Sequence, residues 1–112
     1  MEAIAAKPCF DWLITYRCPY IIPADIFGRA RIEAVNIHPS LLPSYPGLNP
    51  WEEMSKVHEQ QGGVTLHRLT EEADKGEIIM QESFAIELDK GIDEARDRAD
   101  NVAARLCRDY LY

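Results

Sequence analysis

The chain has 112 residues, a formal net charge of −7 at pH 7 and 46% hydrophobic residues, which suits one small domain or part of a larger one. Its negative net charge and scattered Lys and Arg residues argue against general nucleic-acid binding, although a small local anion pocket is compatible with this composition. The apolar runs are too short to cross a membrane, and Lys7 and Pro8 interrupt the apolar start that a secretory signal would need.

A short apolar run begins the predicted secondary structure. Residues 12–16 (WLITY) are apolar and rich in β-formers, a pattern typical of a parallel strand that is buried on both faces. Residues 17–22 are expected to be an irregular loop, because Pro19 cannot donate a hydrogen bond to a sheet. A short helix is expected at residues 24–27, and a second strand at residues 32–37.

A proline-containing segment, residues 36–50 (NIHPSLLPSYPGLNP), follows the second strand. Asn49 as N-cap, Pro50 as the first helical residue and Glu52 two positions later provide the pieces of a capping box, so a helix of about ten residues is expected here. The glycine pair at 62–63 would end this helix. Its inner face would carry Trp51, Met54 and Val57.

Two strands and a long helix complete the pattern. Residues 63–69 (GVTLHRL) and 77–87 (EIIMQESFAIE) are expected to pair as a hairpin-like unit around the polar turn at 70–76. The last segment predicts an amphipathic helix with apolar residues at steps of three and four, namely Ile92, Ala95, Ala99, Val102, Leu106 and Tyr110. No linker or repeat divides the chain, so we expect one domain unit over residues 1–112.

Asn36 and His38 form a candidate site at the end of the second predicted strand. Residues two apart on an extended chain point to the same face, so both polar side chains can face one cleft. An amide N–H can donate to an oxygen that becomes negatively charged, and an imidazole can transfer protons. The sequence alone therefore indicates a candidate site with an oxyanion donor and a proton-transfer group.

The cysteines and histidines indicate neither a disulfide framework nor a metal site. Cys9, Cys18 and Cys107 are odd in number and show no CxxC pattern, which favours a reducing compartment, with the cytoplasm as the default. The three histidines and the acidic residues lack a compact ligand spacing. We expect a protein without a metal.

The segments NIHPSLLPSYPG and GVTLHRLTEEADKGEIIMQ, in this order and at this spacing, resemble the folate-dependent formyltransferase family, and most closely its glycinamide ribonucleotide formyltransferase branch. The likeness covers about Asp11 to Ile86. It implies the C-terminal portion of a Rossmann-like α/β domain, with about four strands and flanking helices. The sheet would be mostly parallel, with an antiparallel hairpin-like part.

The resemblance also implies a reaction and its catalytic residues. The family moves a formyl group from 10-formyltetrahydrofolate to a primary amine, which in this branch belongs to purine biosynthesis and one-carbon metabolism. The family's catalytic Asn, His and Asp fall on Asn36, His38 and Asp74. Asn36 and His38 would stabilise the oxyanion and handle protons, and Asp74 would orient the imidazole or a water and favour its charged form.

Further positions follow from the same resemblance. His67 matches a histidine near the site of that branch, although a core histidine or one that supports the site from behind is an equal alternative. His67 and the sequence HPS at residues 38–40 (the HPS element) both favour a small amine acceptor over methionyl-tRNA. Glu71 and Glu72 are more simply solvated turn residues than acid/base groups. The pterin end of the folate would lie against Pro19, Tyr20, Ile21, Ile22, Leu42, Pro43, Thr70, Glu71 and Ala73.

One departure from the family pattern concerns residues 1–10, which contain no glycine-rich loop of the kind that holds the acceptor's phosphate in the family's N-terminal half. Without that half, the strand at Trp12 to Tyr16 would have an open edge. We therefore expect a homo-oligomer, a partner on this edge, or a rearranged N-terminus that covers it. The alternative function is a truncated, inactive formyltransferase-like protein that binds folate or associates with a partner.

Overall fold

The computed structural model describes residues 10–112, and the expectation that the N-terminus covers the sheet edge lies largely outside these described residues. Four strands form one sheet in the order β1-β2-β3-β4. The elements in chain order are β1 (Phe10–Tyr16), α2 (Ala24–Phe27), β2 (Ala30–His38), α3 (Pro50–Lys56), β3 (Gln61–Arg68), β4 (Ile78–Ala85), the short 3-10 helix η1 (Leu88–Lys90) and α4 (Ile92–Leu111).

The sheet is mixed, with one parallel pair and two antiparallel pairs. β1 runs parallel to β2, whereas β2 with β3 and β3 with β4 are antiparallel. The α/β class and the hairpin-like pairing are confirmed, but the expectation of a mostly parallel sheet was wrong. Two consecutive strands can run parallel only when the connection between them carries the chain back along the sheet, usually as a helix. Here most of the connection from β2 to β3 is loop, and α3 rises only about 10 Å over its seven residues.

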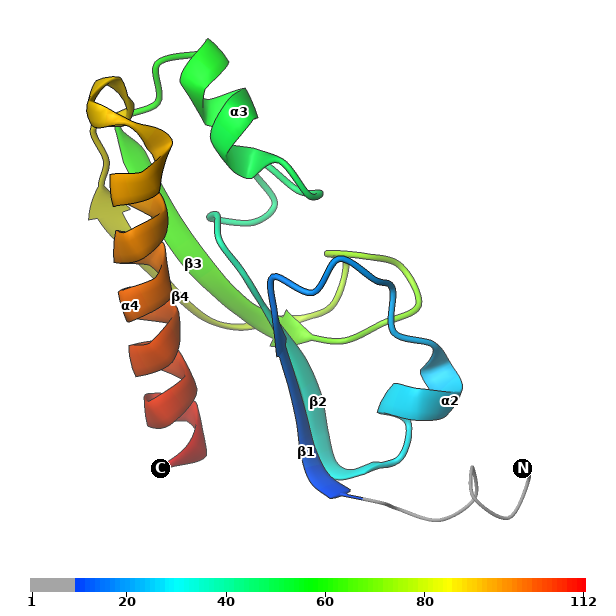
Figure 1. The fold of residues 1–112 in the computed structure, drawn as a ribbon. Helices are drawn as coiled ribbons and strands as arrows, with labels where there is room; N and C mark the ends of the chain where they lie inside the picture. Colours follow the sequence, from blue (N-terminus) through cyan, green and yellow to red (C-terminus); the bar gives the residue numbers. More distant parts are fainter. Residues whose placement is uncertain (1–9) are drawn as a thin grey trace.

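α4 covers one face of the sheet and provides much of the core (Figure 1). Its buried residues are Ala95, Ala99, Val102, Ala103 and Leu106. The three- and four-residue spacing predicted for this helix is confirmed, and its small alanines let the helix lie close to the buried side chains of β3, among them Leu66. None of the helices in residues 10–112 is long and apolar enough to span a membrane.

α3 ends earlier than the sequence pattern predicts. Asn49 occupies the N-cap position, but its side chain makes no capping hydrogen bond, and the helix stops at Lys56. Val57 is 62% exposed and does not belong to the inner face. The two glycines expected to end this helix lie instead in β3, where a Cβ on Gly63 would come within 2.3 Å of the Leu41 side chain. The close approach of Leu41, in the loop after β2, to the backbone of Gly63 explains this glycine better than helix termination does.

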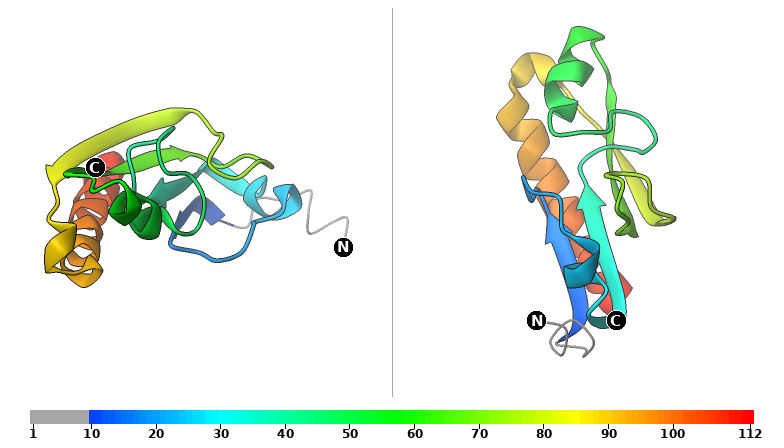
Figure 2. Two further views of the ribbon diagram at one scale, coloured as in Figure 1. Left: turned by 90° about the horizontal axis from the view of Figure 1, so that it is seen from above. Right: turned by 90° about the vertical axis from the view of Figure 1, so that its right-hand side faces the viewer.

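β1 lies at one edge of the sheet. Within residues 10–112 it pairs only with β2, and none of its side chains is fully buried. The expectation of a strand buried on both faces was therefore wrong for this part of the chain. Figure 2 shows α4 and α2 on opposite sides of β1 and β2, with the outer edge of β1 uncovered by the other described elements.

Candidate active site

A cavity of about 540 Å³ opens where β1 and β2 end. Its wall combines the ends of β1, β2 and β3, the loops that follow them, the first turn of α3 and one residue of α4. The predicted residues Asn36, His38 and Asp74 all line it. The complete lining is Thr15, Arg17, Cys18, Pro19, Tyr20, Ile21, Ile22, Asn36, Ile37, His38, Pro39, Gly47, Leu48, Pro50, Trp51, His67, Leu69, Thr70, Glu72, Ala73, Asp74 and Arg96.

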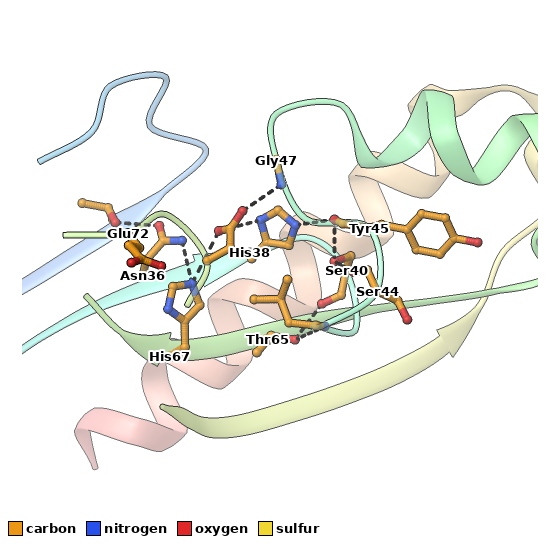
Figure 3. A network of polar contacts seen from close by, with 12 residues as sticks. Asn36, His38, Ser40, Ser44, Tyr45, Gly47, Thr65, His67 and Glu72 are labelled. Carbon is orange, nitrogen blue, oxygen red and sulfur yellow. Dashed lines mark hydrogen bonds and ion pairs between the residues drawn. The ribbon is translucent and has the colours of Figure 1, made fainter. Parts of the chain in front are cut away.

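Asn36 is held by one residue from each neighbouring strand. The sheet register places Thr15 of β1 and His67 of β3 beside it. The Thr15 hydroxyl donates to Oδ1 of Asn36 at 2.6 Å, and Nδ2 of Asn36 lies 3.1 Å from Nε2 of His67 (Figure 3). The amide is therefore fixed in orientation, and the second hydrogen of its NH₂ group is available to a bound molecule.

The hydrogen bonds of His67 define which of its nitrogens carries the proton. Nδ1 of His67 lies 2.9 Å from the carbonyl oxygen of Arg68, and because a carbonyl only accepts, Nδ1 must donate. In the neutral ring Nε2 is then an acceptor, which matches the Asn36 N–H that faces it. His67 is 1% exposed. Although buried, His67 belongs to the cavity lining, and its Nε2 also lies 3.8 Å from Oδ1 of Asp74.

His38 is buried between a backbone carbonyl and a carboxylate. Its Nε2 donates to the carbonyl oxygen of Tyr45 at 2.8 Å, and its Nδ1 lies 3.4 Å from Oδ1 of Asp74. Ser40 Oγ also donates to the Tyr45 carbonyl, at 3.1 Å, so this acceptor is itself held in place. A neutral ring would turn a lone pair toward the carboxylate, so the pair is satisfied when one proton lies between Nδ1 and Asp74.

Asp74 reaches the cavity from the turn between β3 and β4. Its backbone is left-handed, with φ at 59°, and its Oδ2 accepts from the backbone N–H of Gly47 at 2.8 Å. The turn is closed tightly, because a Cβ on Gly76 would lie 1.6 Å from the carbonyl oxygen of Arg68. The requirement for glycine two residues after Asp74 thus has a steric cause, and the turn places the carboxylate where it is only 12% exposed.

The residues predicted to contact folate divide into two groups. Pro19, Tyr20, Ile21, Ile22, Thr70 and Ala73 line the cavity, whereas Leu42, Pro43 and Glu71 do not. Leu42 is instead buried in the interior at 5% exposure, and its N–H donates to Thr65 Oγ1. Glu71 is exposed, as the solvated-turn interpretation expects.

Sequence reasoning missed several cavity residues, among them the polar and charged residues Thr15, Arg17 and Arg96. Thr15 follows from the parallel register with Asn36, a signal that the strand pattern alone does not contain. Arg96 lies on a helix assigned to packing, and only the three-dimensional arrangement brings it to the cavity. In the part of the chain that the structure describes, no group of three or more His, Cys, Asp or Glu side chains is arranged to hold a metal ion.

Two tyrosines anchor the elements around the cavity. Burial, together with a hydrogen bond from its hydroxyl to Asp100 at 2.5 Å, raises the pKa of Tyr16. This contact ties the end of β1 to α4. The hydroxyl of Tyr45 donates to Glu59 at 2.8 Å, which raises the pKa of Tyr45 and lowers that of Glu59. Tyr45 therefore positions His38 through its carbonyl and fixes the loop through its side chain.

Fold and site together define a folate-type formyltransferase architecture, and comparison with known proteins identifies the family. The Formyl transferase family matches residues 5–109, and the chain belongs to it. Methionyl-tRNA formyltransferase of Coprothermobacter proteolyticus is 34% identical over 102 residues, which cover 91% of this chain and 34% of that protein. The chain spans about a third of the length of the curated relatives that it matches.

Solved structures of two other formyltransferases share the fold. The phosphoribosylglycinamide formyltransferase from Bacillus halodurans is 32% identical with a TM-score of 0.74, covering 86% of this chain and 50% of that one. The formyltransferase PseJ from Anoxybacillus kamchatkensis, in complex with UDP-4,6-dideoxy-4-formamido-L-AltNAc and tetrahydrofolate, is 30% identical with a TM-score of 0.77 and covers 90% of this chain and 53% of that one.

Proposed function

We propose that the chain carries the reaction centre of a formyltransferase, which moves a formyl group from 10-formyltetrahydrofolate to a small primary amine. The observation that carries this proposal is the meeting of Asn36, His38 and Asp74 around one cavity, although Asp74 is 38 positions from Asn36 in the sequence. His38 contacts Asp74, Asn36 contacts His67, and Nε2 of His67 lies 3.8 Å from Oδ1 of Asp74, so the four side chains form one polar wall.

The cavity fits a folate co-substrate in size and chemistry. A volume of about 540 Å³ lies within the range of small-molecule sites, which combine apolar walls with a few convergent polar groups. Tyr20, Ile21 and Leu48 would form the apolar wall around the pterin, and the turn at 70–74 its polar side. When bound, 10-formyltetrahydrofolate supplies the formyl group.

The three polar residues can perform the steps that formyl transfer requires. The remaining N–H of Asn36 would donate to the formyl oxygen as it becomes negatively charged. His38 would hold a proton at Nδ1 beside Asp74 and exchange it, directly or through a water, with the attacking and leaving nitrogens. Asp74 lies 3.4 Å from Nδ1 of His38, where its carboxylate would stabilise the imidazole when it carries a proton, and it is itself held by the Gly47 N–H.

For the acceptor, we propose a small amine of the phosphoribosylglycinamide kind and therefore a role in purine biosynthesis. The HPS element and His67 favour this branch. The methionyl-tRNA formyltransferases among the curated relatives are the competing branch, since they match in sequence over the same region.

The test is a formyl-transfer assay with 10-formyltetrahydrofolate and phosphoribosylglycinamide. It is run with the chain alone, and again after adding the part of the Bacillus halodurans enzyme that this chain does not match. Turnover under either condition that disappears on His38→Ala supports the proposal. Binding of folate without turnover under both conditions overturns it in favour of the second candidate.

The second candidate is a formyltransferase-like protein without turnover that binds folate or associates with a partner. Within residues 10–112 the outer edge of β1 pairs with no other strand, which favours this candidate, because unpaired N–H and C=O groups are a site for pairing with another chain. We propose as occupant a strand from a polypeptide that carries the remaining half of the domain. The matched structures contain about twice the length that this chain covers, which supports that choice.

A further inference from the structure

Thr15 is a polar residue near the end of β1, and it lines the same cavity as Asn36. The parallel register of β1 and β2 places the two residues directly opposite each other. The Thr15 hydroxyl lies 2.6 Å from Oδ1 of Asn36, which is short for a hydrogen bond between two oxygens, usually about 2.7–2.8 Å. A well-formed hydrogen bond therefore reaches Asn36 from the neighbouring strand.

The hydrogen bonds around Asn36 have only one arrangement while His67 is neutral. Nε2 of His67 accepts, because Nδ1 donates to a carbonyl, so the NH₂ group of Asn36 is the donor in their contact. The amide oxygen Oδ1 then faces β1, where the Thr15 hydroxyl donates to it. An amide turned by 180° would place Oδ1 against the lone pair of Nε2, with no proton between the two acceptors.

The end of β1 is tied to α4 by the residue that follows Thr15. The Tyr16 hydroxyl donates to Asp100 at 2.5 Å, and Nη1 of Arg17 lies 3.4 Å from the same carboxylate. Successive residues of a strand point to opposite faces, so the contact of Tyr16 with α4 leaves Thr15 directed to the other face. Thr15 thus contacts Asn36 from a strand that is held on its opposite face.

We propose that Thr15 is a positioning residue for formyl transfer and sets its rate through the amide of Asn36. The inference rests on the proposed function, and Thr15 acts on Asn36 and not on the reacting atoms. Its hydroxyl keeps the amide from rotating and, by drawing electron density toward Oδ1, makes the free N–H of Asn36 a stronger donor. Both effects matter most when the formyl oxygen becomes negatively charged, so they raise kcat more than they improve substrate binding.

The kinetic test is Thr15→Val, which removes the hydroxyl and keeps a β-branched side chain of the same shape. In the formyl-transfer assay, kcat should fall about 3- to 10-fold, the effect of one neutral hydrogen bond, while the KM for the amine stays the same. Thr15→Ser retains the hydroxyl and should restore most of kcat. Ser83→Ala, which removes a hydroxyl from an exposed position of β4 outside the cavity lining, is the matched control and should change neither constant.

A second measurement follows the amide itself and needs no turnover. The two hydrogens of the Asn36 NH₂ group give separate NMR signals, which are identified by their loss in Asn36→Ala. A hydrogen bond to the oxygen of an amide increases the double-bond character of its C–N bond, so it slows rotation about that bond. In Thr15→Val the two signals should therefore shift and exchange with each other faster, and Thr15→Ser should restore them. Ser83→Ala should leave them unchanged.

Each outcome of these measurements decides for or against the role of Thr15. A Thr15→Val variant that keeps the kcat of the parent, or its Asn36 signals, would overturn the proposal. So would a raised KM for the amine at constant kcat, which would place Thr15 in contact with the acceptor, or a loss that Thr15→Ser shares in full. If the parent chain shows no turnover with or without the added half, the proposed function fails, and the Asn36 signals still decide whether Thr15 positions the amide.

Discussion

Nδ2 of Asn36 lies 3.1 Å from Nε2 of His67, a residue 31 positions later on the neighbouring antiparallel strand. Because Nδ1 of His67 donates to a carbonyl, Nε2 is the acceptor in this contact. The buried histidine therefore orients the amide that faces the cavity.

His67 should behave as a positioning residue and not as a substrate contact. His67→Leu leaves the Asn36 N–H without its acceptor, so we expect kcat in the formyl-transfer assay to fall about 10- to 100-fold, the scale of a supporting residue around an active site. The KM for the amine should change little. His67→Gln should recover part of kcat, because its side-chain oxygen can accept from Asn36.

The control for this prediction is His58→Asn. His58 is exposed and has φ at 54°, a conformation that asparagine tolerates well. It should leave both kinetic constants unchanged. A His67→Leu variant that raised KM for the amine and kept kcat would show that His67 contacts the substrate.

Asp74→Asn should remove turnover without unfolding the protein. The amide can still accept from Gly47 but no longer stabilises a charged His38, so kcat should fall about 10²- to 10⁴-fold, the usual size of general acid–base catalysis. His38→Ala should do the same. Thermal unfolding checks the fold, and Asp97→Asn on the exposed side of α4 is the control. Activity near that of the parent in Asp74→Asn would remove Asp74 from the mechanism.

The sequence predicts the elements of this fold better than it predicts how they pair. The three- and four-residue period of α4, the position of Asn36 and His38 at the end of β2 and the hairpin around the turn at 70–76 all depend on local chemistry, and the structure confirms them. The direction of β3 relative to β2 depends on how far residues 39–60 carry the chain, which no local pattern encodes. That is why the mostly parallel sheet was a wrong expectation.

The candidate site shows the same division. Asn36, His38 and Asp74 belong to short motifs, so their positions were predictable. Arg96 reaches the cavity only because α4 lies beside the end of β1, and the sequence pattern of an amphipathic helix gives no sign of that. Leu42 was placed at the cavity wall on resemblance, whereas it is buried in the interior.

Thr65 should be a stability determinant of the loop that holds His38. Its buried hydroxyl donates to the Ser40 carbonyl at 2.7 Å and accepts from Leu42 N–H and Gln81 Nε2. Thr65→Val removes the hydroxyl and leaves these partners without it at a position that is 0% exposed, so we expect a loss of about 2 kcal/mol in the free energy of unfolding. Urea denaturation measures it. Ser55→Ala on the exposed face of α3 should stay within about 0.5 kcal/mol, and a similarly small change for Thr65→Val would contradict the prediction.

Tyr45 and Glu59 should show a linked pH dependence. Tyr45→Phe removes the hydrogen bond that lowers the pKa of Glu59, so that pKa should rise toward its ordinary value. A lowered folded-state pKa contributes stability above the unfolded value, and this contribution is lost as pH falls through the folded value. The difference in melting temperature between parent and variant should therefore shrink in acid.

Carboxyl NMR titration of Glu59 checks the direction of this shift. Tyr112→Phe, at a residue that is fully exposed, is the control. An unchanged Glu59 titration in Tyr45→Phe would show that the hydrogen bond does not form in solution.

The β1 edge should bind the complementary half of a formyltransferase domain. Sedimentation velocity should show a complex when the unmatched part of the Bacillus halodurans enzyme is added, because its strands can pair with the open edge of β1. Leu13→Lys, a change outside the core cluster, should weaken this complex, since lysine on an edge strand discourages pairing. Arg108→Gln, an exposed change on α4, is the control. A chain that stays monomeric after the other half is added, or that forms only homo-oligomers, would exclude this occupant.

Thr15, Asn36 and His67 stand side by side on three adjacent strands, and this row restricts how the gene can change in length. Adding or deleting one residue within β2 ahead of Asn36 would turn its amide to the opposite face of the sheet. It would separate Asn36 from both of its neighbours in a single event. Length variation among functional homologues should therefore fall in the connections that precede and follow β2, and not within the strand itself.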